Sequence, residues 1–338
     1  MKLLIPSTLI LLFSVFSFSA NMGTLNEINK PKTLSVKGDK LIITEEESIY
    51  IYSLETLKLT KKFGKEGEGP GEFKMGHGVV SLNIDISDNN IIVNSSTKIT
   101  WFSMEGEYIR EKKVPPMKYL IPMNYGYAGN CLINAGKKFP VQSVCLFDKN
   151  FKKVETLMTS DVPVGMGAKR MMPPYNFKYL VHNNKIYLSA GKDKILIKVF
   201  DQKGKELNNI KLSADSLPVS SKYKNMVRTF YKTDPAFKNF WPRMKDRLYF
   251  PEYFPGLKDL FVDKNRIYIQ TWNKKGGNLE WILLDKTGKE LKRIFLPQGK
   301  ESAIVYSPYT IANGKYYYLK EDIDEEVWGL FVMDLDKK

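Results

Sequence analysis

The stretch IDISDNNIIVNSSTKITWFSMEGE, residues 84–107, decides the fold because its pattern recurs along the chain. Asn89 and Asn90 form a polar turn pair, and the β-branched run Ile91–Val93 follows directly. A second run ends in the residues WFS at 101–103 and leads into another turn. Asn and Gly adopt turn conformations readily, whereas β-branched and aromatic residues favour strands. The stretch therefore predicts short consecutive strands joined by tight turns.

The same arrangement occurs six times along the chain. Each copy begins with a polar turn pair; the six pairs are Gly38-Asp39, Asn89-Asn90, Gly129-Asn130, Asn183-Asn184, Lys264-Asn265 and Asn313-Gly314. The residues that end the second run of each copy are Ser53, Ser103, Asp148, Asp201, Asp285 and Asp334, which lie 45 to 53 residues apart except for one interval of 84. A period near 45 to 50 residues with about four strands per unit is typical of a propeller blade.

The repeats predict an all-β fold, a six-bladed β-propeller of four-stranded antiparallel blades. The last unit, residues 304–334, ends after three strands, and residues 24–30 are left over at the other end of the chain. We expect the N-terminal segment to supply the missing outer strand, because this closes the ring and removes an open sheet edge.

The loop FGKEGEGPGEF, residues 63–73, holds four glycines in eight residues. A phosphate-binding P-loop needs the spacing G-x-x-x-x-G-K-[ST] before a helix. Here the spacing differs, no Lys-Ser or Lys-Thr follows, and Glu66, Glu68 and Glu72 would repel a phosphate. We interpret the loop as a connection in which glycines supply positive φ angles and Pro70 stiffens the turn.

The second unit, from Gly64 to Gly106, resembles the NHL-type six-bladed propellers, and especially the exported six-bladed propeller proteins of bacteria. The resemblance is carried by Gly71-Glu72-Phe73 and by the residues of 84–93 and 99–106. It implies that residues 63–73 join the outer strand of one blade to the inner strand of the next. All such links lie on one face of a propeller.

The first twenty residues have the pattern of a secretory signal peptide. Lys2 precedes the apolar run Leu3–Phe18, and Ser17 and Ser19 form a small-x-small cleavage site. The apolar run is shorter than the roughly 20 residues that span a bilayer. We expect cleavage after Ser19 or Ala20, a mature propeller at 21–338 without a transmembrane segment, and localisation in the periplasm or outside the cell.

Export bears on the two cysteines, Cys131 and Cys145, because disulfides persist in oxidising compartments. Both lie in runs that read as adjacent strands of one hairpin. The sequence allows either a disulfide or two buried thiols.

Four outer-to-inner links are long: 63–73, 157–174, 213–255 and 297–307. Long loops on a rigid scaffold are where function concentrates. The longest lies between the fourth and fifth units and predicts a helical insertion at about 217–250. Ser220 or Ser221 can cap a run to Tyr231, and Asp234-Pro235 predicts the start of a second run to about Leu248.

The formal charge of +15 favours an anionic partner. We expect an envelope protein, a peptide or an anionic glycan rather than nucleic acid. The candidate ligand-binding residues are Lys238, Trp241, Arg243, Lys245, Arg247 and Tyr249 of the insertion, together with Lys169 and Arg170 of another rim loop. Basic residues interleaved with aromatics can grip an anionic polymer. The alternative is a cap whose aromatics pack on the disc while its lysines are solvated.

A metal-dependent enzyme is the alternative function. His77 and His182 are the only histidines, so a three-histidine zinc site is excluded. A calcium site in the central channel would draw on Asp85, Asp263, Asn83 or Asn124, which lie on or near inner strands. Clustered methionines, Met158, Met166, Met171 and Met172, suit either adaptable packing or a soft metal.

The sequence thus favours an exported, non-catalytic binding module that presents its site on the loop-rich face and needs no cofactor. A calcium-dependent hydrolase or lyase with a channel metal is the second hypothesis. A structural subunit of an envelope complex is the third, with the helical insertion as its docking element.

Overall fold

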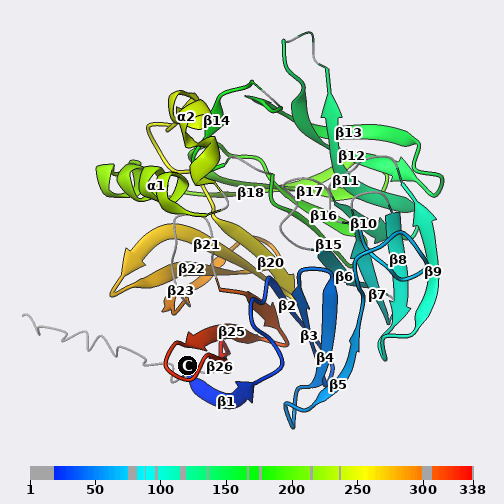
Figure 1. Cartoon of the computed structure of the whole chain (residues 1–338). Coiled ribbons are helices and arrows are strands. Elements are labelled where there is room, and N and C mark those ends of the chain that lie inside the picture. Colours follow the sequence, from blue (N-terminus) through cyan, green and yellow to red (C-terminus); the bar gives the residue numbers. More distant parts are fainter. Residues whose placement is uncertain are drawn as a thin grey trace, which may run out of the picture.

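The computed structural model describes residues 19–336 except 75–81, 88, 96–97, 115–118, 135, 137, 166, 175–176, 214–215, 236 and 299–306. The described residues form six four-stranded antiparallel sheets arranged as the blades of a propeller (Figure 1). The predicted six-bladed β-propeller is confirmed.

The blades follow one another in chain order. The first is β2 (Thr33–Lys37), β3 (Lys40–Glu45), β4 (Ser48–Ser53) and β5 (Leu59–Phe63), and the second is β6 (Asn83–Ser87), β7 (Asn90–Asn94), β8 (Lys98–Ser103) and β9 (Tyr108–Lys113). The third is β10 (Leu120–Met123), β11 (Gly126–Ile133), β12 (Val141–Asp148) and β13 (Lys153–Pro163), and the fourth is β15 (Tyr179–His182), β16 (Lys185–Ser189), β17 (Ile195–Asp201) and β18 (Glu206–Leu212). The fifth is β20 (Asp259–Asp263), β21 (Arg266–Lys275), β22 (Asn278–Asp285) and β23 (Glu290–Leu296). The sixth is β24 (Tyr309–Ala312), β25 (Lys315–Asp322), β26 (Val327–Asp334) and β1 (Ala20–Leu25).

The middle strands of the blades are buried on both faces because neighbouring blades pack against each other. Strand β12, for example, is buried from Val141 to Phe147, whereas the outer strand β9 is mostly exposed. Buried residues of adjacent blades form shared clusters, such as Ile42 and Ile51 of the first blade with Val93 of the second. Near-continuous apolar runs in the middle strands follow from this two-sided burial.

The recurrent aspartate at the end of the third strand has a local role. Asp201 Oδ1 accepts hydrogen bonds from the backbone N–H groups of Lys203 and Lys205, both at 2.9 Å. Asp148 and Asp285 make the equivalent pairs of bonds at their own turns. Aspartate favours such turns because its carboxylate satisfies backbone donors two and four residues ahead.

The third repeat departs from the sequence prediction. Gly129 and Asn130 were expected to form a turn, but they lie inside β11, and the turn falls before Gly126. A Cβ at Gly129 would lie 2.5 Å from the Leu120 side chain and 2.8 Å from the Tyr119 carbonyl oxygen. The glycine is therefore needed for close approach of β10 rather than for chain reversal.

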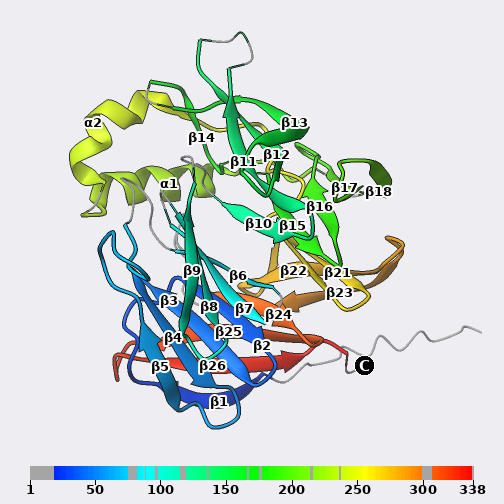
Figure 2. The same ribbon diagram turned by 90° about the vertical axis from the view of Figure 1, so that its right-hand side faces the viewer.

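The N-terminal segment closes the ring, as predicted. Strand β1 pairs antiparallel with β26 and forms the outer edge of the last blade; Figure 2 shows the two lying side by side. The strand covers Ala20–Leu25 rather than beginning at Thr24. Leu25 is completely buried, and the Trp328 indole N–H donates to the Asn29 carbonyl oxygen at 2.9 Å.

The glycine-rich loop lies between β5 and β6 in the chain, and the side chain of one buried lysine forms hydrogen bonds with it. Lys98 Nζ donates to the Gly69 carbonyl oxygen at 2.6 Å and to Glu111 Oε2 at 2.7 Å. Gly64 has a φ of +86°, and a Cβ there would meet the Glu47 carbonyl oxygen at 2.5 Å. These contacts give the loop a structural role.

The insertion between β18 and β20, the fourth and fifth blades counted from β2, is helical, as predicted. Helix α1 (Ser221–Thr233) begins after Ser220, whose hydroxyl accepts from the Tyr223 N–H at 3.2 Å. The second run is broken into η1 (Lys238–Phe240), α2 (Trp241–Met244) and η2 (Lys245–Arg247), followed by β19 (Leu248–Tyr249). Asp234 is the C-cap of α1, and η1 begins after its own N-cap residue Phe237, three residues later than the predicted start.

The two cysteines form a disulfide between β11 and β12, which settles the two alternatives that the sequence left open. Cys131 pairs with Ser143 in the strand register, and Cys145 pairs with Gly129, so the bridge runs diagonally across the two strands. Within the described ranges no helix is long and apolar enough to cross a bilayer.

Candidate functional site

The two faces of the ring differ in their loops. The link face is the end at which the chain crosses from the outer strand of one blade to the inner strand of the next, and it carries the helical insertion. The turn face is the opposite end, where tight turns join the inner strands to the second strands. The predicted ligand-binding residues belong to the link face.

The predicted residues come together on one structure, here called the cap, which consists of residues 217–254 with the short strand β14 (Arg170–Met171). Strand β14 pairs in parallel with β19, placing Arg170 opposite Leu248 and Met171 opposite Tyr249. The Met172 N–H adds a bond to the Tyr249 carbonyl oxygen at 2.8 Å. Two rim loops distant in sequence are thereby joined.

The cap combines an apolar underside with a basic outer surface. Tyr223, Val227 and Tyr231 are buried in a cluster that also contains Phe254. The basic side chains Lys169, Arg170, Lys238, Arg243, Lys245 and Arg247 are all exposed. Residues 217–254 contain eight basic and three acidic residues. The structure therefore supports both interpretations of the insertion at once, a packed cap and a cationic surface.

Aromatic and cationic groups also touch one another on the cap. The Arg170 guanidinium lies 5.6 Å from the Tyr231 ring centroid, and the Arg228 guanidinium lies 5.1 Å from that of Phe250. Tyr249 is 48% exposed, whereas Trp241 is half-buried against the apolar cluster. Tyr249 is thus open to a ligand, and Trp241 chiefly packs.

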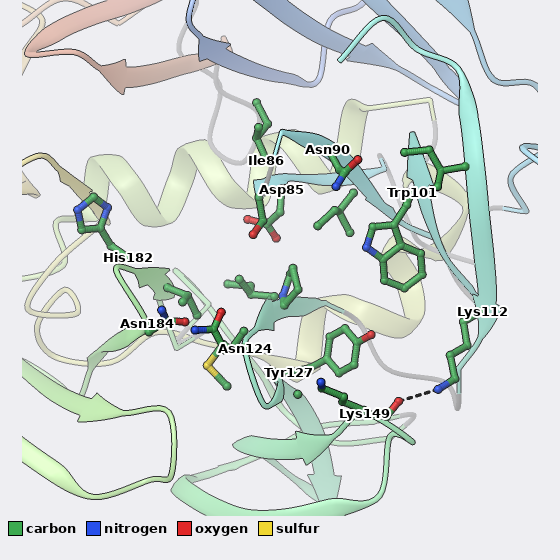
Figure 3. Close-up of a pocket in the computed structure, with 18 of the residues that line it drawn as sticks. Asp85, Ile86, Asn90, Trp101, Lys112, Asn124, Tyr127, Lys149, His182 and Asn184 are labelled. Carbon is green, nitrogen blue, oxygen red and sulfur yellow. Dashed lines mark hydrogen bonds between the residues drawn. The ribbon is translucent and has the colours of Figure 1, made fainter. Parts of the chain in front are cut away.

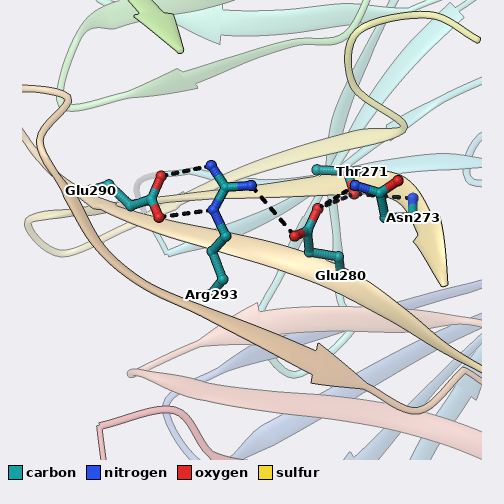
Figure 4. A network of polar contacts seen from close by, with 5 residues as sticks. All are labelled: Thr271, Asn273, Glu280, Glu290 and Arg293. Atoms are coloured by element: carbon teal, nitrogen blue, oxygen red, sulfur yellow. Dashed lines mark hydrogen bonds and ion pairs between the residues drawn. The ribbon is translucent and has the colours of Figure 1, made fainter. Parts of the chain in front are cut away.

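A buried polar network holds the segment of β21 that packs against the cap (Figure 4). Strand β21 has a bulge between Gln270 and Lys274, and Trp272 of this bulge stacks on Phe254 with ring centroids 4.7 Å apart. Buried Glu280 accepts from the Thr271 hydroxyl at 2.7 Å and from the Asn273 amide at 3.0 Å. These bonds hold both neighbours of Trp272 and so fix its position.

One cavity, which sequence reasoning missed, lies at the turn face between the second and third blades (Figure 3). Its volume is about 1010 Å³. The wall is made by the inner strands β6, β10 and β15, by the outer strand β9, and by the turns that follow β10, β12 and β15. Charged and amide residues dominate it: Lys37, Asp85, Asn90, Arg110, Lys112, Asn124, Lys149, Asn150, His182 and Asn184.

Among the described residues, β6 and β10 pack less closely than the other neighbouring inner strands. The second and third blades are joined instead by a side chain of β7. The Asn94 amide accepts from the Leu120 N–H at 3.0 Å and donates to the Leu120 carbonyl oxygen at 3.1 Å. The Tyr119 hydroxyl, next to Leu120, is near enough to the Asp85 carboxyl to lower its pKa.

Asp85 is the carboxylate at the inner wall of this cavity. Burial raises the pKa of Asp85 to about 6, and the hydrogen bond from Tyr119 opposes part of this rise. Among the described residues Asp85 Oδ2 has no hydrogen-bond partner. The same burial raises the pKa of the Tyr119 and Tyr179 hydroxyls well above the usual range, so both remain neutral donors. A perturbed carboxyl beside a cavity is a mark of functional sites.

The outer wall of the cavity is cationic. The Arg110 guanidinium lies over the Trp101 ring at 4.1 Å from its centroid. Lys112 lies over the Phe151 ring at 4.5 Å, and its Nζ donates to the Lys149 carbonyl oxygen at 2.6 Å. Trp101 also lines the cavity, but it is only 5% exposed.

A second cavity of about 690 Å³ occupies the channel mouth at the link face. Here Asp259 accepts from the Tyr309 hydroxyl at 2.7 Å and pairs with Lys178 at 3.3 Å. Its carboxylate is therefore already matched by a donor and a cation.

The residues considered for a calcium site do not converge. Asp85 and Asn124 line the turn-face cavity, whereas Asn83 lies at the other mouth. Asp263 accepts from the Gly314 N–H at 2.7 Å. The ranges described contain no group of three His, Cys, Asp or Glu side chains placed to hold a metal ion.

The other sequence candidates are dispersed. His182 lies at the rim of the turn-face cavity, 3.2 Å from the Lys264 carbonyl oxygen, and His77 falls outside the described residues. Met158 packs between the third and fourth blades, whereas Met172 is buried under the cap. Met166 also falls outside the described part of the chain. The methionines whose packing is described therefore serve separate clusters.

A match to a family model supports the fold. Residues 24–173, fewer than half of the chain, match the model of a family (DUF5128) described as a 6-bladed beta-propeller. The solved Pan2 WD40 domain of Neurospora crassa is similar at a TM-score of 0.48 and 9% identity, covering 95% of this chain and 96% of that chain. No curated protein matches the sequence. Nothing about the function follows from these similarities.

Proposed function

We propose that this propeller is an exported, non-catalytic binding module of the NHL type whose cap grips an anionic partner. The observation that carries the proposal is the pairing of β14 with β19. This pairing places Lys169 and Arg170 on the cap together with the basic residues of the insertion. Because the apolar underside anchors the cap to the disc, its cations face outward on a rigid support, which is how scaffolds present binding loops.

Export to the periplasm or beyond is supported by two features. The N-terminal residues 1–20 have the composition of a signal peptide, although residues 1–18 lie outside the described part of the chain. The Cys131–Cys145 disulfide belongs to an oxidising compartment. The predicted cleavage after Ser19 or Ala20 would leave the closing strand β1 at or beside the mature N-terminus.

The partner we propose is an anionic glycan of the cell envelope, with an acidic protein or peptide as the alternative. Exposed lysine and arginine side chains attract any dense anion, and such attraction weakens as salt rises. Specificity comes from the exposed Tyr249 and from the arginines held against aromatic rings.

The test is a charge reversal on the cap. The variant carries Lys238→Glu, Arg243→Glu, Lys245→Glu and Arg247→Glu, and the matched control reverses the exposed Lys152, Lys203, Lys205 and Lys286 on the turn face. Binding to immobilised heparin and to a polyglutamate peptide is measured across a salt series. We expect the cap variant to lose ~10-fold or more in affinity and the control to lose much less. Equal losses in both variants would show that overall charge, not the cap, governs binding.

The second candidate function, a calcium-dependent hydrolase or lyase, rests on Asp85 and Asn124 lining one cavity. Elemental mass spectrometry of the purified protein, paired with thermal melts with and without chelator, tests it. One calcium per chain and a melting temperature that falls on chelation would support this function, since a ligand that binds only the folded state stabilises it. A metal-free protein with an unchanged melt would rule against it.

A further inference from the structure

We infer that the cavity between the second and third blades binds an acidic saccharide, with Arg110 and Lys149 pairing with its carboxylate and Asn124 and Asn184 bonding its hydroxyl groups. The cavity lies on the turn face, away from the cap. The inference is therefore independent of the proposed function of the cap, and the two can fail separately.

The first argument is the placement of charge. Arg110, Lys112 and Lys149 lie on the outer strand and the outer turn that wall the cavity. None of the three forms an ion pair with a carboxylate among the described residues. The Arg110 guanidinium lies over the Trp101 ring, and this contact restricts its donors before a ligand arrives. A planar, ordered guanidinium is suited to bidentate binding of a carboxylate.

The second argument is the opposite character of the inner wall. Asp85 lies on the inner strand β6, and its carboxyl would repel an anionic group that came close. A ligand that fits both walls presents carboxylate to the outer wall and neutral polar groups to the inner wall. Inorganic phosphate is charged all round, so it satisfies only the outer wall. An acidic saccharide, which carries both carboxylate and neutral hydroxyl groups, can satisfy both.

The third argument is the supply of amides. Asn124, Asn150 and Asn184 are exposed residues of the turns around the cavity, and Figure 3 shows Asn124 and Asn184 on the same side of it. Each amide offers two donors and an acceptor, which match the mixed donor and acceptor character of sugar hydroxyls.

The aromatic residues of the wall argue against a nucleotide. Binding of a base relies on an open aromatic face on which the base stacks. Trp101 is 5% exposed with Arg110 over its ring, and Tyr127 is 8% exposed with its ring against Phe151. Neither ring is open. The volume of about 1010 Å³ is at the upper end of small-molecule sites and leaves room for a short oligosaccharide.

The test is isothermal titration calorimetry of the full mature chain with digalacturonate, with the neutral disaccharide galactobiose and with inorganic phosphate as comparison probes. We expect digalacturonate to bind at least ~10-fold more tightly than either, because it alone matches both walls. Binding of phosphate as tight as that of digalacturonate would reduce the site to a simple anion site and overturn the inference. Equal binding of galactobiose would show that the cations play no part, with the same consequence.

Single-residue variants test whether digalacturonate binds in this cavity. Lys149→Ala should weaken digalacturonate binding by ~5- to 10-fold, whereas Lys152→Ala, an exposed lysine of the same turn, should change it less than ~2-fold. Asn184→Asp adds a like charge and should weaken binding further. Thermal melts check that each variant is folded. If Lys149→Ala and Lys152→Ala bind alike, or if digalacturonate does not bind the parent protein, the assignment of this cavity is wrong.

Discussion

At the scale of one residue, Asp85 in the channel wall is a choice that stability alone does not explain. Its carboxyl is buried with one hydroxyl donor and no neighbouring cation close enough to lower its pKa. Folding therefore raises the pKa of Asp85 to about 6, whereas in the unfolded chain the carboxyl ionises near its ordinary pKa of 3.8. A carboxyl group that lowers the unfolding free energy and lies beside a cavity indicates a role in that site.

The pH dependence of stability follows from this shift. Because the folded pKa is the higher one, the folded state binds more protons between pH 4 and 6, and the unfolding free energy falls as pH rises through that window. A shift from 3.8 to about 6 corresponds to ~3 kcal/mol. Relative to the parent, Asp85→Asn should gain about this much stability between pH 4 and pH 7 in urea unfolding. A constant difference across that range would contradict the assignment.

Asn94 is the residue on which the join between the second and third blades depends. It is 7% exposed, and its amide makes both bonds to the Leu120 backbone. Asn94→Ala would leave two backbone groups without these partners, and we expect a loss of ~2–4 kcal/mol in unfolding free energy. Asn209→Ala, at an exposed position of β18, serves as the control and should cost under ~1 kcal/mol. A comparable loss in both variants would show that Asn94 has no special role.

Some single-residue roles were readable from the sequence and others were not. The aspartates at the third-strand ends recur with a turn glycine or asparagine nearby, and their roles are local, so the pattern is sufficient. Gly129 was misassigned because its role depends on Leu120 and Tyr119, which approach it from another strand. Close approach between strands leaves no signature in the residues next to the glycine.

At the scale of elements, side-chain contacts couple the bulge in β21 to the cap. Arg293 donates to both carboxylate oxygens of Glu290 at 2.8 and 2.9 Å and reaches Glu280 at 3.5 Å (Figure 4). Glu280 in turn holds Thr271 and Asn273 on either side of Trp272. The cap is therefore tied to the outer strand of the fifth blade through β22.

This coupling predicts a local consequence of Glu280→Ala. The variant frees the bulge and should lower the unfolding free energy by ~2 kcal/mol. Hydrogen exchange should accelerate most at residues 271–274 and in α1, because Trp272 loses its fixed position beneath Tyr223. Glu290→Ala removes only the half-exposed partner of Arg293 and should cost at most ~1 kcal/mol. Exchange that is unchanged in α1 would separate the network from the cap.

The helical insertion was predictable in its first half and not in its second. Helix α1 has a serine cap and an apolar stripe at helical spacing, so it is specified locally. The following run splits into short 3₁₀ and α pieces, which carry no periodic pattern long enough to read. Its pairing with β14 depends on contact between two loops and could not be derived from either one.

The disulfide acts on the molecule as a whole by restricting the unfolded chain. Cys131 and Cys145 are 14 residues apart, and a loop of this size contributes ~3 kcal/mol in the chain-entropy account. Chemical unfolding of the oxidised and the reduced protein should differ by about this amount. The double variant Cys131→Ala, Cys145→Ala should match the reduced protein and be insensitive to reductant. A parent protein unaffected by reductant would show that the bridge adds no stability.

The whole architecture was predictable, whereas the cavity was not, for one physical reason. The number of blades follows from a local pattern of turn and strand residues that occurs six times in the sequence. The cavity follows from how the second and third blades pack against each other, which depends on contacts between strands far apart in the sequence. Sequence analysis singled out Asp85 as an acid on an inner strand, but its neighbours on the outer strand β9 could be identified only from the structure.

The joining of the two chain ends in one blade also governs when the molecule can finish folding. The Asn29 carbonyl oxygen and the Trp328 indole are 299 positions apart, and β1 has no partner until β26 has been synthesised. The first five blades use contacts within successive stretches and can form as the chain lengthens. The last cannot, because closing so long a loop carries a large entropic cost and contacts of this range form slowly. Ring closure therefore has to wait for β26, and until it occurs both β1 and the edge of β26 remain open to other strands.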